Sequence, residues 1–323
     1  MKVRRLGTSG LKVSEIGLGC NNFGQRLDLE ATRRVVHRAL DLGITLFDTA
    51  DGYGNRGGSE TQLGEVLGAK RRDIVLATKF GWPMDDIGVL RGGSRRYLMR
   101  AVEDSLRRLK TDWIDLYQFH TPDPETPLEE TLRALDDLVR QGKVRYVGCS
   151  NFLAYRLAKA LGRSETLGLA RFDSIQPRYN LLFREFEREL FPLCAEERVG
   201  VIPYNPIAGG MLSGKHRRGA PTEGTRFTLG NASQTYQDRY WHDREFDTVA
   251  QLTAVADELG TELVTLAVAW VLANPVITSP IIGASRPEQL DASVAALDLT
   301  LDADVKRRLD DLTADYRRGD AVR

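Results

Sequence analysis

Short apolar runs alternate along this chain with longer amphipathic segments. The short runs are apolar nearly throughout, which is typical of strands covered on both faces. We predict eight such strands, over residues 15–19, 45–47, 74–78, 113–119, 145–148, 174–176, 201–204 and 279–282. In segment 94–110 between them, Leu98, Val102, Leu106 and Leu109 recur at helical spacing. Segment 128–141 shows the same pattern, so the sequence predicts helices between the strands.

Start signals for these helices are also present. Thr126 is placed to cap the helix over 128–141, Pro127 suits its first turn, and Glu129 completes a capping box. The same spacing recurs with Ser59 and Gln62 and with Ser285 and Glu288. We therefore expect helices to begin at these points.

A strand, a helix and a further strand at intervals of about 30 residues predict right-handed parallel units. Eight such units indicate an α/β fold, a closed (β/α)8 TIM barrel, which we assign as one domain over residues 1–323. The rival is a doubly wound sheet, which normally carries GxGxxG after its first strand. Here the first strand is followed by GCNNFG at 19–24, which does not match.

Three further segments decorate the predicted barrel. Residues 3–13 contain a Gly-Thr-Ser-Gly turn between two short β runs, so we expect a hairpin that closes the bottom of the barrel. Residues 207–245 form a long loop after strand seven, and a segment of that length is usually functional or disordered. Residues 302–316 predict a last helix.

Composition narrows the function classes. The chain has 45 Lys and Arg against 45 Asp and Glu, so its zero net charge gives no case for a nucleic-acid partner. Its three cysteines, Cys20, Cys149 and Cys194, form no CxxC pair and indicate no zinc or redox site. Free thiols suit a reducing compartment, and neither a signal peptide nor a membrane span is expected. We predict a cytoplasmic protein.

Polar side chains stand where successive strands end, which is where barrel enzymes place their chemistry. Asp48 and Tyr53 follow strand two, Lys79 follows strand three, and His120 follows strand four. Each alone has a structural interpretation as a turn, wall or core residue, but an unpaired buried ammonium is costly, so Lys79 needs a partner. We expect Asp48 to pair with Lys79, and Lys79 to lower the pKa of Tyr53 from about 10.

Together, these four residues suit the protonation of an oxygen on which negative charge develops, with His120 hydrogen-bonding a carbonyl oxygen. The sequence shows no metal cluster, and Lys79 is the only obvious nucleophile.

Several motifs make the chain resemble an aldo-keto reductase of bacterial type over essentially its whole length. In the first half of the chain they are LGTSGL at 6–11, DTA at 48–50 with Tyr53, SE at 59–60, LG at 63–64, TK at 78–79, LYQFH at 116–120, GKVR at 142–145 and GCSNF at 148–152. In the second half they are Gln176 with Tyr179 and Asn180, GGMLSGK at 209–215, GAS at 283–285 and EQL at 288–290. The resemblance implies reduction of an aldehyde or ketone by NADPH. It implies a catalytic tetrad of Asp48, Tyr53, Lys79 and His120, in which Tyr53 is the general acid.

The resemblance also implies an NADPH site across the barrel mouth. Ser150, Asn151 and Gln176 would hold the carboxamide, and Tyr204 would stack on the nicotinamide ring. Arg286, at the start of a helix from Ser285, would take the 2′-phosphate. The implied cofactor residues are Gly19, Asp48, Ser150, Asn151, Gln176, Tyr204, Asn205, Pro206, Ile207, Leu212, Lys215, Gly283, Ser285, Arg286, Gln289 and Ser293.

This sequence departs from part of the family pattern, since some members have a lysine at the position of Gly283 and an asparagine at the position of Ser293. Use of NADH as well as NADPH therefore stays open. Asn22, Phe23 and Trp82, with Tyr53 and His120, are the expected substrate contacts. Charged residues in the loop 84–96 point to a polar or charged ligand. The resemblance implies that the substrate is a small carbonyl compound, which includes sugar-like ones, and a homo-oligomer stays open.

The sequence leaves three alternatives. Lys79 on a barrel strand would suit a Schiff-base aldolase if its amine were unpaired. A nucleotide-sensing subunit of a larger assembly is the second alternative, because channel-associated β subunits share several motifs, but they lack the catalytic histidine that His120 supplies. The third is a reductase of a nucleotide-linked sugar.

Overall fold

Eight parallel strands form the centre of the protein, and their hydrogen bonds close the sheet on itself. The computed structural model describes residues 1–230 and 232–320. The strands pair in the order β10-β3-β4-β5-β6-β7-β8-β9. Their bounds are β3 (Gly17–Gly19), β4 (Leu46–Asp48), β5 (Val75–Phe80), β6 (Ile114–Phe119), β7 (Val144–Ser150), β8 (Ser174–Gln176), β9 (Gly200–Val201) and β10 (Ile281–Gly283). The Ile281 amide donates to the Pro203 carbonyl at 2.8 Å, so the chain just beyond β9 reaches β10 and closes the sheet. The predicted (β/α)8 fold is confirmed.

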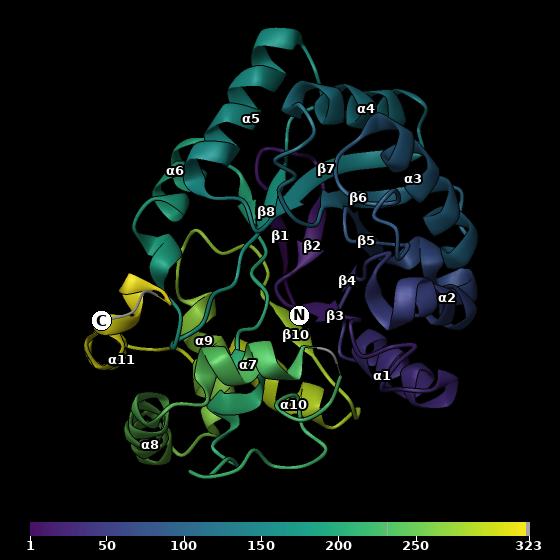
Figure 1. Ribbon diagram of the computed structural model, residues 1–323. Helices are drawn as coiled ribbons and strands as arrows, with labels where there is room; N and C mark the ends of the chain where they lie inside the picture. The colour runs from purple at the N-terminus through teal and green to yellow at the C-terminus, as the bar shows by residue number, and fades with distance from the viewer. Residues whose placement is uncertain (231, 321–323) are drawn as a thin grey trace.

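Helices surround this sheet on its outer side (Figure 1). They are α1 (Leu29–Asp41), α2 (Tyr53–Leu67), α3 (Arg95–Leu109), α4 (Leu128–Arg140), α5 (Ala154–Leu167), α6 (Leu190–Glu196), α8 (Asp243–Glu258), α9 (Leu263–Leu272), α10 (Gln289–Val294) and α11 (Ala303–Leu312). Short 3-10 turns are η1 (Gly68–Asp73), η2 (Glu185–Glu187), η3 (Ala208–Ser213), η4 (Ala295–Leu297) and η5 (Ala314–Arg318). The segment predicted as one long loop contains η3 and a further helix, α7 (Ser233–Tyr240). Within the described residues, no helix is both long enough and apolar enough to cross a membrane.

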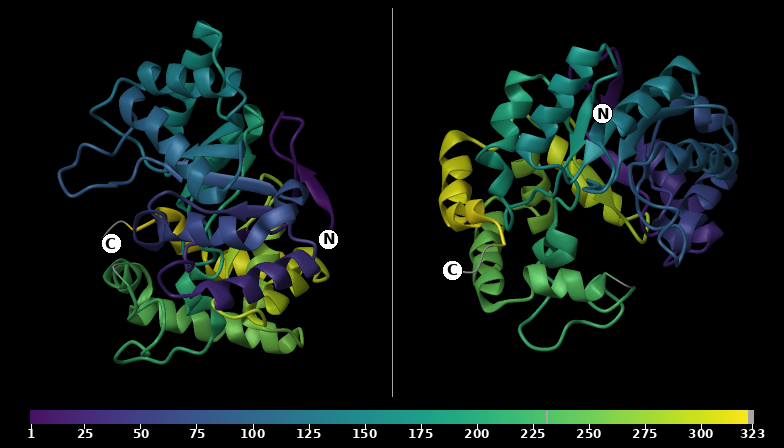
Figure 2. Two further views of the ribbon diagram at one scale, coloured as in Figure 1. Left: turned by 90° about the vertical axis from the view of Figure 1, so that its right-hand side faces the viewer. Right: turned by 45° about the horizontal axis from the view of Figure 1, so that its top comes forward.

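The predicted hairpin is present and forms one end of the barrel. Its strands, β1 (Val3–Arg5) and β2 (Lys12–Ser14), pair antiparallel. Leu6 and Val13 are fully buried, in one cluster with side chains of the barrel strands. Gly7 has φ +58°, and a Cβ there would lie 2.7 Å from a backbone oxygen that precedes β8, so this close approach requires glycine. The hairpin and the loop 84–94 lie on opposite sides of the barrel (Figure 2).

The three capping boxes predicted from spacing do not form. Helix α4 has Pro127 at its N-cap, because the Thr126 hydroxyl donates instead to Asp123 Oδ2 at 2.6 Å. Ser59 lies inside α2 and donates to the Cys20 carbonyl at 2.7 Å. Helix α10 begins at Gln289 rather than at Ser285, and the Gln289 side chain accepts the Ser285 amide at 2.7 Å. Nearby polar partners thus outcompete the local cap in each case.

Candidate active site

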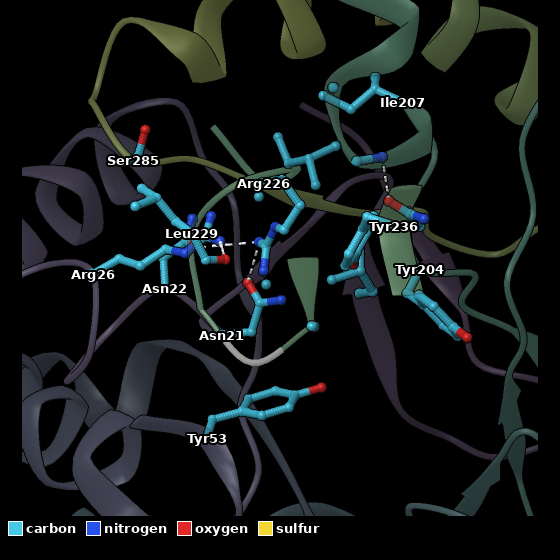
Figure 3. A pocket seen from close by; sticks show the side chains of 18 of the residues that line it. Asn21, Asn22, Arg26, Tyr53, Tyr204, Ile207, Arg226, Leu229, Tyr236 and Ser285 are labelled. Carbon is cyan, nitrogen blue, oxygen red and sulfur yellow. Dashed lines mark hydrogen bonds between the residues drawn. The ribbon is translucent and has the colours of Figure 1, made fainter. Parts of the chain in front are cut away.

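A cavity of about 1510 Å³ opens where the barrel strands end, at the carboxyl end of the sheet. The ends of β3, β4, β7, β8 and β10 contribute Gly19, Asp48, Ser150, Gln176 and Gly283 to its lining. The segment after β9 completes the wall, and Figure 3 shows Tyr53 and Tyr204 together with side chains of that segment. This is the end of a (β/α)8 barrel at which active sites are found.

A buried ion pair forms the floor of the cavity. The ammonium of Lys79 on β5 donates to Asp48 Oδ2 at 2.6 Å and to the Thr49 carbonyl at 2.8 Å. Gln118 and Gln176 donate to the other carboxylate oxygen of Asp48 at 2.9 and 3.0 Å. Lys79 is fully buried and paired, so the aldolase alternative, which needs an unpaired amine, is disfavoured.

Tyr53 and His120 meet directly above this pair. The phenolic oxygen of Tyr53 lies 3.4 Å from His120 Nε2, and the two rings pack edge to face at 5.4 Å. The Lys79 ammonium lies 4.9 Å from the centre of the Tyr53 ring. The structure therefore brings Asp48, Tyr53, Lys79 and His120 together, with Lys79 beneath the cavity rather than in its lining.

The pKa of Tyr53 moves opposite to the expected direction. Burial raises it well above its usual value, and the Asp48 carboxylate raises it further. The expected Asp48–Lys79 pair is present at 2.6 Å, but burial of the phenol, which the sequence did not reveal, outweighs any lowering by nearby cations. Tyr53 therefore faces the cavity as a protonated phenol.

The imidazole of His120 is held neutral. Burial lowers its pKa well below the usual value, and the nearby Lys79 charge lowers it further. The Trp82 ring stacks on the imidazole at 4.1 Å with an angle of 5° between the planes. The Asn151 side chain donates to the His120 carbonyl at 2.9 Å. A neutral imidazole held in place by these contacts can hydrogen-bond to a substrate oxygen without placing a positive charge beside it.

This neutrality gives a testable linkage. The unfolded chain takes up a proton on His120 below about pH 6.5, whereas the folded protein does not. The folded state consequently loses stability as pH falls. We expect the wild type to lose about 1.4 kcal/mol per pH unit relative to His120→Asn below pH 6.5, measured by urea unfolding. A pH-independent difference between the two proteins would contradict a neutral His120.

Most of the predicted ligand residues line the cavity. The lining contains Gly19, Asn22, Asp48, Tyr53, Trp82, His120, Ser150, Asn151, Gln176, Tyr204, Asn205, Pro206, Ile207, Lys215, Gly283, Ser285, Arg286 and Gln289. The side chain of Tyr204 donates to Asn151 Oδ1 at 3.0 Å, which orders this part of the wall.

Phe23, Leu212 and Ser293 are not among these lining residues. The Phe23 side chain is fully buried in a core cluster with Leu27 and Leu63, so it does not form the predicted substrate wall. Leu212 is fully buried in the core, and Ser293 is only 3% exposed on the inner side of α10. Loop position can be predicted from sequence, but the direction of each side chain depends on what packs beneath it. The five charged residues noted in the loop 84–96 are likewise absent from the cavity lining.

Sequence reasoning missed two arginines that line the cavity, Arg226 in the segment after β9 and Arg26 in the segment after β3. Arg226 donates to Asn21 and Asn22 side-chain oxygens at 3.1 and 3.0 Å, as Figure 3 shows, and lies 5.3 Å from the Tyr236 ring. Arg26 donates to the Leu229 carbonyl, and burial, followed by the charge of Arg226, lowers its pKa to about 10. In the sequence, only the mixture of aromatic and basic residues in 226–240 could have indicated that Arg226 lines the cavity.

Comparison with known proteins gives the same assignment along nearly the whole chain. The Aldo/keto reductase family matches residues 15–314. An uncharacterized oxidoreductase, YrpG, of Bacillus subtilis is 38% identical, over 97% of this chain and 96% of its own. The L-glyceraldehyde 3-phosphate reductase of Escherichia coli K12 is 34% identical, over 98% and 93%. A probable voltage-gated potassium channel subunit beta of Arabidopsis thaliana is 35% identical, over 93% and 92%.

The extent of these matches agrees with the barrel and with the strand-end residues that it brings together. The protein belongs to the aldo/keto reductase family and is an oxidoreductase of that family.

Proposed function

We propose that this protein reduces an aldehyde or ketone to an alcohol with NADPH, and that Tyr53 supplies the proton. The observation that carries the proposal is the 3.4 Å approach of the Tyr53 phenol to the neutral His120 imidazole, over the buried Asp48–Lys79 pair. The two groups offer one carbonyl oxygen a hydrogen-bond donor and a proton donor together.

The cavity suits an extended dinucleotide. Asn151 and Gln176 hydrogen-bond to His120 and Asp48, and Ser150 to Asn151, so their amide and hydroxyl groups lie beside Tyr53, where a carboxamide needs such partners. Lys215 and Arg286 supply further positive charge in the lining, which phosphates need. The residues therefore fit NADPH, which when bound would supply the hydride. The members of this family generally use NAD(P)H, and the preference for NADPH is part of our proposal.

The proton step follows from the state of Tyr53. A phenol with a raised pKa keeps its proton until the oxygen that it faces becomes strongly basic. An alkoxide oxygen is far more basic than a phenolate, so the proton moves only as the carbonyl acquires negative charge. The Lys79 charge, 4.9 Å from the ring centre, then stabilises the phenolate that remains.

Substitution of Arg286 tests the preference for NADPH over NADH. Its side chain is exposed at the edge of the cavity, and we assign it to the 2′-phosphate that only NADPH carries. A charge-assisted contact of roughly 1.5–3 kcal/mol implies that Arg286→Ala weakens NADPH binding by about 10- to 150-fold. The dissociation constant for NADH should hardly change, and Arg33→Ala on the outer helix α1 is the charge control. Equal losses for both cofactors would remove Arg286 from the phosphate site.

The proposed activity itself is tested by following the loss of NADPH absorbance with a panel of aldehydes, ketones and sugars. A phosphorylated aldehyde belongs in the panel because the Escherichia coli relative is named for one, and because Arg26 and Arg226 add positive charge to the cavity. Turnover with any carbonyl compound would support the proposal. Binding of NADPH without oxidation by any of them would favour the alternative of a nucleotide-sensing subunit of a larger assembly, since one similar protein is a probable voltage-gated potassium channel subunit beta.

A further inference from the structure

A second carboxyl group lies two residues before Tyr53, but on the other side of the loop. Asp51 is fully buried and is not among the residues that line the cavity. Its amide donates to the Lys79 carbonyl at 3.1 Å, and its Oδ2 accepts a hydrogen bond from the Tyr97 hydroxyl of α3 at 2.6 Å. Its Oδ1 is buried and has no hydrogen-bond partner among the residues that the structure describes. A buried carboxyl with one oxygen unsatisfied is costly and needs a reason.

The groups that face Asp51 come from several elements. Glu60 on α2 brings a second negative charge, while α3 brings the Arg108 guanidinium and β6 the Tyr117 ring. Arg108 is held by Glu60, whose carboxylate it contacts at 2.7 Å, and so it neutralises Asp51 only in part. Burial, followed by Glu60, raises the pKa of Asp51 to about 7, against the opposing effects of the Tyr97 bond and Arg108. Asp51 therefore exchanges its proton around neutral pH.

The hydroxyl of Tyr97 has one hydrogen and two acceptors within reach. Asp51 Oδ2 lies 2.6 Å from it, and the backbone carbonyl of Trp82 lies 3.4 Å from it. An ionised Asp51 takes the hydrogen, because a charge-assisted bond is the stronger one. When Asp51 gains a proton, its carboxylic acid can donate to the Tyr97 oxygen instead. The hydrogen of Tyr97 is then free for Trp82, and only one proton has been taken up from solvent.

The position of Trp82 matters for the cavity. Its ring stacks on His120 at 4.1 Å and meets Tyr53 edge to face at 5.8 Å. It also packs on Gly52, where an added Cβ would lie 3.1 Å from the ring. A shift of the Trp82 backbone would therefore move the wall beside both groups that face the carbonyl oxygen.

We propose that Asp51 and Tyr97 are positioning residues that fix the Trp82 wall, and that protonation of Asp51 tightens this wall around the substrate. The proposal rests on the proposed carbonyl reduction for its kinetic consequence, but not for its structural one. Neither residue touches the substrate. They act through the backbone carbonyl of Trp82.

Two measurements separate this proposal from the proposed activity. In the first, intrinsic tryptophan fluorescence of the cofactor-free protein is followed from pH 5.5 to 8.5, with Trp82→Phe identifying the part that comes from Trp82. We expect a transition near pH 7 in the wild type. Asp51→Asn should remove it, because the amide donates to Tyr97 at every pH. No turnover is needed for this measurement.

In the second, kinetics are measured with whichever carbonyl compound is reduced. We expect the KM of the wild type to rise about 2- to 10-fold between pH 6 and pH 8, the effect of one neutral hydrogen bond. Asp51→Asn should keep the low KM at both values. Tyr97→Phe should show the high KM at both, with NADPH binding unchanged.

Tyr117→Phe is the matched control, because it removes from the same cluster a buried hydroxyl that has no hydrogen-bond partner within residues 1–230 and 232–320. It should keep the transition and the KM profile of the wild type. A purely structural role would lower the melting temperature of Asp51→Asn and Tyr97→Phe but leave both pH profiles in place. Wild-type profiles in these two folded variants would overturn the proposal, even if carbonyl reduction itself is confirmed.

Discussion

Replacing Tyr53 with phenylalanine is expected to lower the rate of carbonyl reduction by at least about 100-fold, the lower limit for losing a general acid. The change removes one oxygen, and this oxygen is the group that faces His120 Nε2 at 3.4 Å. The ring itself stays, with its contacts to Trp82 and to the Lys79 ammonium. The substitution should therefore lower kcat and leave the stability of the folded protein nearly unchanged.

Measuring NADPH binding distinguishes a role of Tyr53 as proton donor from a role in holding the cofactor. Fluorescence titration of Tyr53→Phe should give nearly the wild-type dissociation constant, because the proposed cofactor contacts lie on other residues. Tyr155→Phe on α5, a tyrosine that is 67% exposed, is the control and should be fully active. Loss of NADPH binding together with turnover would show that Tyr53 holds the cofactor and would leave the proton donor unidentified.

The parts of this site that sequence predicted are those fixed by the barrel topology. Asp48, Lys79 and His120 each lie at or directly after the end of a predicted strand, and parallel strands in sequence order bring such residues to one rim. The Asp48–Lys79 pair follows from the cost of a buried ammonium, which leaves few other solutions. Residue type and strand position were sufficient in these cases.

The parts that sequence could not predict depend on packing between distant segments. Asp51 meets Tyr97 across 46 residues, and Arg226 meets Asn22 across 204, so no local pattern signals either contact. Thr126 fails as a cap because Asp123 offers its hydroxyl a better partner. The pKa of Tyr53 was predicted in the wrong direction because burial of the phenol, and then the Asp48 carboxylate, raise it more than nearby cations lower it. In each case the outcome depends on burial or on contacts between segments that come together only in the folded chain.

The ion pair beneath the site gives the largest expected effect on stability. Lys79→Met should lower the free energy of unfolding by about 3–5 kcal/mol, because it leaves the buried Asp48 carboxylate without its cation. Gln118 and Gln176 still donate to that carboxylate, but they bring no charge. Urea unfolding with a far-UV signal measures the loss. Arg307→Met on α11 is the control: its pair with Asp304 is largely exposed and should contribute less than about 1 kcal/mol.

A double variant distinguishes what the pair does for folding from what it does for catalysis. Adding Asp48→Asn to Lys79→Met removes the unpaired charge, so most of the lost stability should return. Turnover should not return with it, because the double variant still lacks the cation that lies 4.9 Å from the Tyr53 ring. A double variant as unstable as Lys79→Met would show that packing of the lysine stem, and not its charge, holds this end of the barrel together. A stable and active double variant would show that Tyr53 needs no cation beneath it.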